Sequence, residues 1–238
     1  MLILGIDSSC ASAGAALIKL NGFEKDAAVN VSGGSFELIG RIMQADKRTH
    51  SVKLLPEIQA LIESHSLTPA DLDLIAVTVG PGSFTGLRIG ASTAKTMARA
   101  LGIPVAGVNT LDALYATADF PGPVLALIDA RNTRAYGCLY IDGKPAAGPV
   151  ADKVSLILDN IAHDHAGISV SACGDALLNK GICDILFTEE RVNVGRESCV
   201  FYPDPAAVAR LGAETFIDAA DKTVFAPEKL SLNYMKEW

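Results

Sequence analysis

Short apolar runs separated by polar turns dominate the first part of this chain. The run at residues 2–6 ends at Asp7, and a second run, 13–20, is followed by an Asn-Gly pair typical of tight hairpin turns. Residues 27–31 and 36–43 show a weaker pattern of the same kind. The beginning of the chain therefore predicts a meander of strands.

Longer periodic stretches follow this meander. In residues 51–65 the leucines and isoleucines recur on one side of a predicted helix, and Pro56 either kinks that helix or moves its start. Residues 72–79 form an apolar run of strand length, residues 84–101 a second helix, and residues 105–108 the next strand. This strand–helix–strand order predicts a parallel pair joined by a right-handed crossover.

An internal repeat links the two halves of the chain. Residues 2–18 align without gaps on residues 124–140, and both segments contain an apolar strand, Ile-Asp, a short polar turn and a return strand. The alignment pairs Asp7 with Asp129. A pattern of this length recurring at half the chain length predicts two similarly built domains.

Composition places the chain among globular proteins and gives it an acidic balance. Half of its 238 residues are hydrophobic, and its formal net charge is −7. Such a length allows one large or two small domains. A protein that holds nucleic acid by itself normally carries a basic surface, so we expect any nucleic acid to be bound through a partner.

Cysteine usage and hydropathy indicate a soluble, cytoplasmic protein. The cysteines are odd in number and widely spaced, which argues against both a disulfide framework and a zinc site. Asp7 interrupts the first apolar run too early for a secretion signal, and no stretch approaches the roughly 18 apolar residues of a membrane span. The cysteines are Cys10, Cys138, Cys173, Cys183 and Cys199.

A glycine-rich turn, GPGSFTG at residues 80–86, precedes the second predicted helix. Its third glycine comes one position too late for a dinucleotide fingerprint, and no lysine follows as a Walker loop requires. Ser83 or Thr85 can cap the helix, whose N-terminus attracts anions. These residues leave two interpretations open, a structural turn and an anion site.

Small residues occupy one side of that second helix. Two glycines cost about 2 kcal/mol of intrinsic helix stability relative to alanine, which indicates that another backbone approaches closely. Packing inside the domain and a seam with another subunit both explain this. The small side consists of Gly86, Gly90, Ala94 and Met97, and Arg88, Lys95 and Arg99 lie nearly opposite.

Two aspartates, Asp7 and Asp129, end the first strands of the repeat. In nucleotide-cleaving enzymes such residues hold a metal–phosphate pair. The second turn, however, contains Arg131 and Arg134 and no glycine until Gly137. We therefore favour the interpretation that the carboxylates accept hydrogen bonds from turn amides.

Histidines offer no clear metal or catalytic site. His163 and His165 are two residues apart, but the surrounding pattern is helical and separates them, so a solvated helix end is the better interpretation. No Ser-His-Asp, Cys-His or HExxH arrangement occurs.

Several of these segments together resemble the bacterial TsaB (YeaZ) family. The resemblance is carried by IDSSCASAGAAL (6–17), TVGPGSFTGLRIGASTAKTMARALGIPVAGVNTLDALYA (78–116) and LIDARNTRAYGCLY (127–140). It continues more thinly in ACGDAL (172–177) and PDPAAVARLGAE (203–214). The resemblance implies the two-domain actin/acetate kinase/hexokinase-like ATPase architecture. This is a ribonuclease H-like α/β fold of duplicated mixed sheets with flanking helices. We therefore expect an N-terminal domain at 1–108 and a C-terminal domain at 109–238, and the last segment of the chain can return to the first domain.

The resemblance also implies a function. TsaB proteins are non-catalytic partners of TsaD, the enzyme that makes threonylcarbamoyladenosine next to the anticodon of tRNA. TsaD carries a His-x-x-x-His metal pair at positions equivalent to Thr110 and Leu114 here, and neither residue is a useful ligand for iron or zinc. The expected protein is a scaffold that homodimerises alone, pairs with TsaD, works with the ATPase TsaE and meets tRNA only through the complex. No tightly bound cofactor or metal is expected, although ATP or ADP lies near the shared interface of the family's complex.

The implied interface uses the two predicted helices of the first domain, and no catalytic residue is expected. Two enzyme functions remain as alternatives: a phosphotransferase of the acetate or sugar kinase class that binds ATP at Asp7 and Asp129, and a glycoprotease-like metallopeptidase, which Thr110 and Leu114 disfavour. A purely structural homodimer is a third. The expected interface residues are Leu54, Leu55, Ile58, Leu61, Ile62, Gly86, Gly90, Ala94 and Met97, and the candidate nucleotide or anion contacts are Ser83, Thr85, Arg88 and Asp7.

Overall fold

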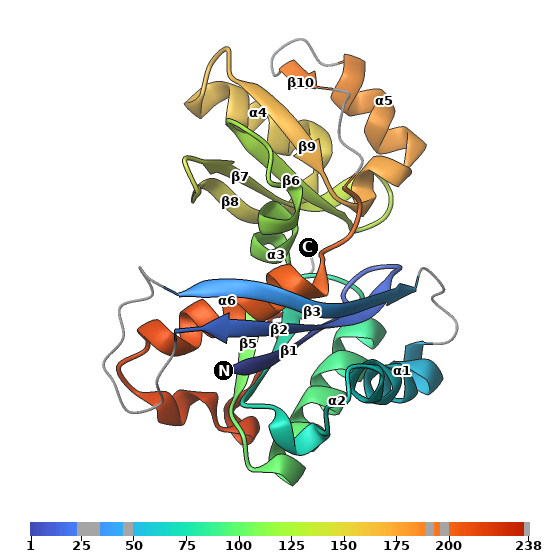
Figure 1. Cartoon of the computed structure of the whole chain (residues 1–238). Coiled ribbons are helices and arrows are strands. Elements are labelled where there is room, and N and C mark those ends of the chain that lie inside the picture. Colours follow the sequence, from blue (N-terminus) through green and yellow to red (C-terminus); the bar gives the residue numbers. More distant parts are fainter. Residues whose placement is uncertain (23–33, 45–49, 189–192, 196–199, 236–238) are drawn as a thin grey trace. The chain divides into compact units, whose positions relative to one another are not determined.

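The chain folds into two compact α/β units in a computed structural model that describes residues 1–22, 34–44, 50–188, 193–195 and 200–235 (Figure 1). The first unit consists of Met1–Asn109 and Asp204–Asn233, and the second of Thr110–Pro203 and Tyr234–Trp238. The strand predicted at 27–31 and Cys199 lie outside the described residues.

The first unit is built on a sheet with the strand order β3-β2-β1-β4-β5. β1 pairs antiparallel with β2 and parallel with β4, and β4 pairs parallel with β5. The predicted antiparallel meander and the predicted parallel crossover are therefore both present. The strands are β1 (Leu2–Asp7), β2 (Ala13–Asn21), β3 (Ser35–Gln44), β4 (Leu74–Gly80) and β5 (Val105–Asn109).

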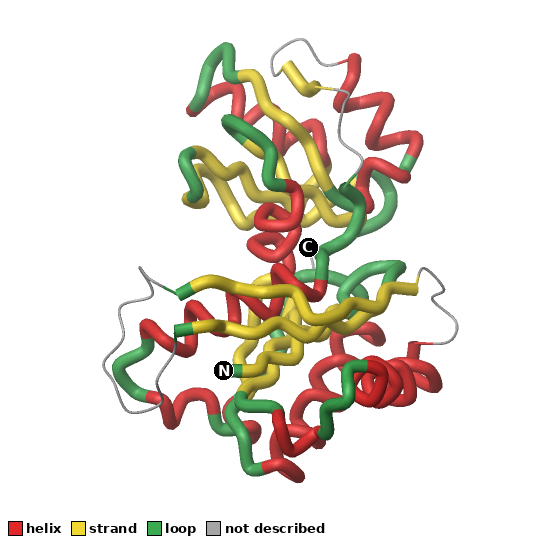
Figure 2. Tube along the Cα trace, viewed as in Figure 1, coloured by secondary structure: helices red, strands yellow, loops and turns green. Residues whose placement is uncertain are grey.

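Helices α1 (His50–Ser64) and α2 (Phe84–Leu101) pack against one face of this sheet, in a shared aliphatic core (Figure 2). Pro56 lies inside α1, so this helix begins ahead of it. Two short turns complete the unit at its C-terminal end, η4 (Lys222–Phe225) and η5 (Pro227–Lys229), and a third, η2 (Pro69–Asp71), precedes β4.

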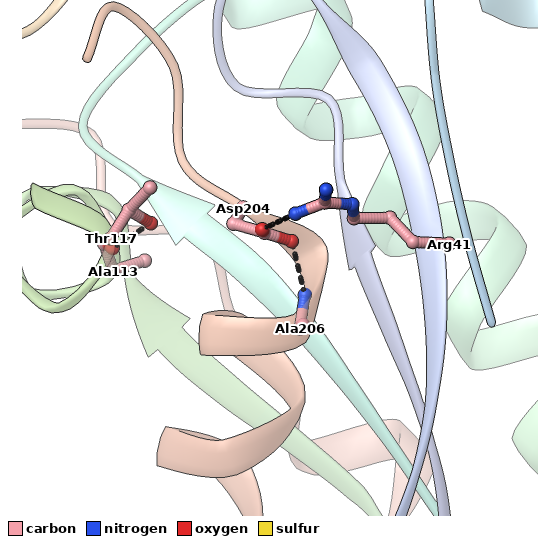
Figure 3. Close-up of polar contacts among 5 residues, drawn as sticks. All are labelled: Arg41, Ala113, Thr117, Asp204 and Ala206. Atoms are coloured by element: carbon pink, nitrogen blue, oxygen red, sulfur yellow. Dashed lines mark hydrogen bonds and ion pairs between the residues drawn. The ribbon is translucent and has the colours of Figure 1, made fainter. Parts of the chain in front are cut away.

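Helix α6 (Pro205–Asp218) contacts β1, β2, β4 and β5 of the same sheet. It comes so close that a Cβ atom on Gly5 would lie 2.0 Å from the carbonyl oxygen of Pro205. Its start is fixed by Asp204, which accepts a 2.9 Å hydrogen bond from the N–H of Ala206 and pairs with Arg41 of β3 (Figure 3). A capping carboxylate at a helix N-terminus also suits the helix dipole.

The second unit repeats the topology, with the strand order β8-β7-β6-β9-β10 and the same pattern of antiparallel and parallel pairs. This confirms the predicted fold of duplicated mixed sheets with flanking helices. Its strands are β6 (Val124–Asp129), β7 (Arg134–Ile141), β8 (Lys144–Lys153), β9 (Ser169–Cys173) and β10 (Asn193–Gly195), and its helices α3 (Thr110–Ala118), α4 (Val154–Asp164), η3 (Asp175–Leu178) and α5 (Lys180–Thr188).

In each unit, the helix that follows the fifth strand in sequence belongs to the fold of the other unit. α3 follows β5 in sequence but packs on β6, β7 and β9, whereas α6 follows the second unit and packs on the first sheet. The second unit is thus nearly continuous in sequence, and the first is assembled from two separate segments.

The sequence repeat matches β1 with β6 but loses register at the turn. Asp7 pairs with Gly14, whereas Asp129 pairs with Ala135, so the second hairpin loop is one residue shorter. The gapless alignment is therefore wrong beyond the turn, although the domain duplication that it predicted is present.

Candidate functional site

The loop that follows β1 in the first unit is closed by its own hydrogen bonds. The side chain of Asp7 is 1% exposed, and its Oδ1 accepts hydrogen bonds from Ser9 N–H at 3.2 Å, Ser9 Oγ at 2.6 Å and Thr78 Oγ1 at 2.7 Å. These bonds fix the loop to β4. Asp7 therefore has a structural position inside the fold, and its contact with a nucleotide stays a prediction.

The glycine turn lies directly on that loop. Ser83 N–H donates a 2.7 Å hydrogen bond to the carbonyl oxygen of Ser9. A Cβ atom on Gly82 would lie 2.4 Å from the same oxygen, and one on Gly86 would lie 2.0 Å from the carbonyl oxygen of Ser8. Of the two interpretations of the turn, the structure shows the structural one, because its glycines permit backbone-to-backbone contact.

The first turn of α2 is exposed beyond this contact. Ser83 is the N-cap, and its Oγ accepts a 3.3 Å hydrogen bond from Gly86 N–H. The Arg88 guanidinium lies 3.8 Å from the centroid of the Phe84 ring, which is 53% exposed. Ser83, Thr85 and Arg88 are therefore accessible, and their nucleotide contact stays a prediction.

The corresponding loop of the second unit is also internally bonded. Asp129 Oδ1 accepts a 2.7 Å hydrogen bond from Arg131 N–H, and its Oδ2 accepts one from Asn179 Nδ2 at 3.4 Å. The N–H of Asp129 donates to Asp175 Oδ1 at 2.8 Å. The interpretation that Asp129 serves turn amides is confirmed. Asp175 and Asn179 were missed, although Asp175 lies in the ACGDAL segment that the resemblance includes.

The two positions that the resemblance aligns with a metal pair lie on α3. Thr110 and Leu114 are both 0% exposed. Within the described ranges, no group of three or more His, Cys, Asp and Glu residues could hold a metal ion. The side chain of His163 is 87% exposed and pairs with Asp164 at 2.8 Å, which confirms a solvated helix end.

The apolar stripe of α1 faces the core of its own unit. Four of its five predicted members are at most 7% exposed and pack in one cluster with Ala94 of α2. Gly86 and Gly90 are likewise buried against Ser8. Packing inside the domain therefore accounts for these side chains in the isolated chain, and their contact with a partner stays a prediction. The buried residues of the predicted interface are Leu54, Ile58, Leu61, Ile62, Gly86, Gly90 and Ala94.

Another part of the same two helices reaches the surface. Val52 and Leu55 of α1 are 74% and 53% exposed, and Phe84 of α2 is 53% exposed. We call these three residues the α1–α2 outer face. Of the predicted interface residues, Leu55 is exposed and Met97 is half-buried against the core. Val52 and Phe84 were missed because they lie outside the apolar stripe that sequence analysis follows.

Among the described residues, no helix combines the length and apolar character that a membrane crossing needs.

Comparison with known proteins supports one family. Residues 37–234 match the family model described as "TsaD: tRNA N6-adenosine threonylcarbamoyltransferase". "tRNA threonylcarbamoyladenosine biosynthesis protein TsaB" of Bacillus subtilis is 29% identical over 237 residues, which cover 98% of this chain and 95% of that protein. An uncharacterized protein of Mycobacterium tuberculosis is 40% identical over 115 residues, 48% of this chain and 54% of the other, so this chain spans about half the length of that relative.

Two solved structures share the fold over most of the chain. An "uncharacterized protein with similarity to peptidase YEAZ from Pseudomonas aeruginosa" has a TM-score of 0.74 at 20% identity and covers 99% of each chain. "YeaZ from Pseudomonas aeruginosa" has a TM-score of 0.63 at 19% identity, with 91% of this chain and 93% of that chain covered. The family model matches most of the sequence and the TsaB relative aligns nearly end to end; the chain therefore belongs to the TsaD family and, within it, to the TsaB (YeaZ) proteins.

Proposed function

We propose that this protein is a non-catalytic subunit in the biosynthesis of threonylcarbamoyladenosine in tRNA, and that it acts by binding a TsaD-type catalytic subunit. The observation that carries the proposal is the nearly end-to-end match to a TsaB protein named for that biosynthesis. On this proposal the protein is cytoplasmic, homodimerises when alone, exchanges into a heterodimer and works with a TsaE-type ATPase. The tRNA and any ATP or ADP are then met at the assembled complex.

The closed loops support a non-catalytic role. In a phosphotransferase of related fold, strand-end aspartates must be open to a metal–phosphate pair. Here Asp7 and Asp129 are engaged by serine, threonine, asparagine and turn amides. A metallopeptidase would need ligands at positions where this chain has Thr110 and Leu114, both buried. The positions that either class of enzyme would need for chemistry are occupied here by buried or hydrogen-bonded side chains.

The α1–α2 outer face is the surface that we assign to the partner. Val52, Leu55 and Phe84 expose apolar side chains on two helices that share one core. Fully burying a leucine or phenylalanine side chain is worth about 1.5–3 kcal/mol relative to leaving it exposed. The half-exposed side chains of this face therefore stabilise a complex that covers them.

Size-exclusion chromatography with a TsaD homologue tests this assignment. We expect Leu55→Glu to abolish co-elution, because a carboxylate would be buried against an apolar partner surface. Leu178→Glu is the matched control, since Leu178 is a 56% exposed leucine on η3 of the second unit. Circular dichroism should show both variants folded. Normal co-elution of Leu55→Glu would remove the outer face from the interface.

A reconstituted modification assay tests the function itself. Threonylcarbamoyladenosine should form with the TsaD homologue, the TsaE homologue and this chain together, and formation should fall when this chain is omitted. Modification by this chain alone would overturn the non-catalytic role.

Ile58→Glu and Gly90→Trp are unsuitable variants for the interface test, because both positions are buried and either change would unfold the first unit.

A further inference from the structure

A groove follows the C-terminal half of α2 on the side where η5 packs. It consists of two adjoining hollows of about 380 and 490 Å³, which share Arg99, Pro227 and Glu228 as lining residues. We call it the α2–η5 groove. It uses neither α1 nor the outer face, so it is a second surface of the same unit.

The floor of the groove is apolar and its rim is basic. Phe225 and Ile103 line the hollow of about 380 Å³, and Phe225 is only 7% exposed. Three cations, Lys95, Arg99 and Lys222, line the hollows against one carboxylate, Glu228. This is a local excess of positive charge on a chain whose net charge is −7.

Two of the rim cations are available to a ligand. Lys222 is engaged with the carbonyl oxygen of Ile217 at 2.8 Å and with the Phe216 ring at 4.7 Å. Lys95 and Arg99 are one helical turn apart on α2, and neither has a hydrogen-bond or ion-pair partner within the described part of the chain. Their charges therefore face solvent and an incoming anion.

The opposite wall is held in place by its own bonds. Asp221 caps η4 by accepting a 2.9 Å hydrogen bond from Thr223 N–H, and Lys229 Nζ donates to Thr223 Oγ1 at 3.2 Å. Phe225 packs edge to face with Phe216, with ring centroids 5.1 Å apart. A wall fixed in this way reduces the ordering cost of binding.

We propose that the α2–η5 groove binds an extended acidic segment of a partner protein. Small-molecule sites bury most of the ligand surface, whereas these two hollows are open to solvent and share lining residues, which suits a segment that spans both. Carboxylates of the segment pair with Lys95 and Arg99, and its alternate apolar side chains lie over Phe225. The narrow basic rim and the acidic remainder of the chain disfavour a nucleic-acid occupant.

Fluorescence anisotropy on the full chain tests the groove. The probe is a short fluorescein-labelled peptide in which glutamate and leucine alternate, and the reference probe has lysine in place of glutamate. Of the two probes we expect only the acidic one to bind, and we expect raising NaCl from about 0.05 to 0.3 M to weaken its binding, because added salt shortens the Debye length and screens the charges. Lys95→Glu/Arg99→Glu should weaken binding at least about tenfold.

The matched control is Lys144→Glu/Lys180→Glu, which changes the net charge equally at two exposed lysines of the second unit. Unchanged binding by this control supports the groove, whereas an equal loss would show only a general charge effect and overturn it. Absence of binding by the acidic probe also overturns it. A fluorescein-labelled oligouridylate that binds in place of the peptide, with the same dependence on Arg99, would assign the groove to RNA instead. Since the probe is bound without a TsaD homologue, these outcomes do not depend on the proposed function.

Discussion

Gly86→Ala tests whether the small residues of α2 serve this chain's own fold. The added Cβ atom would lie 2.0 Å from the carbonyl oxygen of Ser8, well inside the 3.0 Å that real Cβ atoms essentially never cross. Helix α2 would have to withdraw by about 1 Å or more from the loop after β1. The 2.8 Å hydrogen bond from Ser8 Oγ to the Gly86 carbonyl would then lengthen or break.

The expected loss follows from three contributions. Overpacking of this kind costs about 1–3 kcal/mol. Losing the Ser8–Gly86 hydrogen bond costs about 1 kcal/mol, and alanine returns about 1 kcal/mol of helix propensity. The free energy of unfolding should therefore fall by about 2 kcal/mol, which lowers the Tm of a chain of this length by about 4–8 °C.

Urea denaturation of the isolated chain, followed by circular dichroism, measures this loss. Gly181→Ala in α5 is the matched control, because its Cβ atom would meet only the Thr133 methyl group at 3.2 Å and Asn179 Oδ1 at 3.5 Å. We expect this control to be neutral or slightly stabilising. If Gly86→Ala unfolds at the wild-type urea concentration but no longer pairs with a TsaD homologue, the small residues belong to an interface, and packing inside the domain does not explain them.

Three further predictions concern the rest of the fold. Asp204→Ala should lower the free energy of unfolding by about 1–2 kcal/mol, since α6 loses its N-cap; Asp204→Asn should lose less, and equal losses in thermal melts would argue against the cap. Burial raises the pKa of Cys138 to about 11 and of Cys173 to about 12, so both thiols are protonated at neutral pH and become thiolates only as the pH approaches those values. Native chain treated with iodoacetamide at about pH 8 should remain unmodified at both cysteines by mass spectrometry, whereas the urea-unfolded chain should react at both; rapid native modification would contradict their burial. Asp129→Ala should lower the free energy of unfolding of the second unit by about 0.5–1.5 kcal/mol, because the turn loses the 2.7 Å hydrogen bond that the exposed Arg131 amide donates to Asp129; an unchanged urea midpoint would contradict this.

Local signals were sufficient for the strands and helices between Leu2 and Asn109 that the sequence predicted, whereas α6 of the same unit was not predicted. Helix α2 begins and ends at the predicted residues, because Ser83 caps it and Gly102, with φ 68°, adopts the left-handed conformation that ends it. The duplication could be predicted because the strand–turn–strand pattern is also a local signal, which recurs in both halves of the chain. The register beyond each turn could not be predicted, since one residue fewer in the second loop leaves the apolar pattern of the strands intact.

The candidate site was harder to predict, because a helix face that packs in the core of its own domain and one that packs on a partner contain the same types of residue. Ile58 and Gly90 have the apolar and small side chains that either role requires. Only tertiary structure shows that they are already covered and that Val52 and Phe84 are not. The hydrogen bond that Asp7 accepts from Thr78 comes from a neighbouring strand 71 residues away in sequence. A local sequence pattern could therefore not predict it.

The exchange of α3 and α6 has a consequence for biosynthesis of the chain. All of the residues 110–203 leave the ribosome before α6, so the second unit can close while the first still has a bare sheet face above Gly5. The N-terminal strands, made first, are thus finished last. A nascent chain in that interval presents aliphatic surface that chaperones recognise, and a fragment stopped at residue 203 would remain in that state.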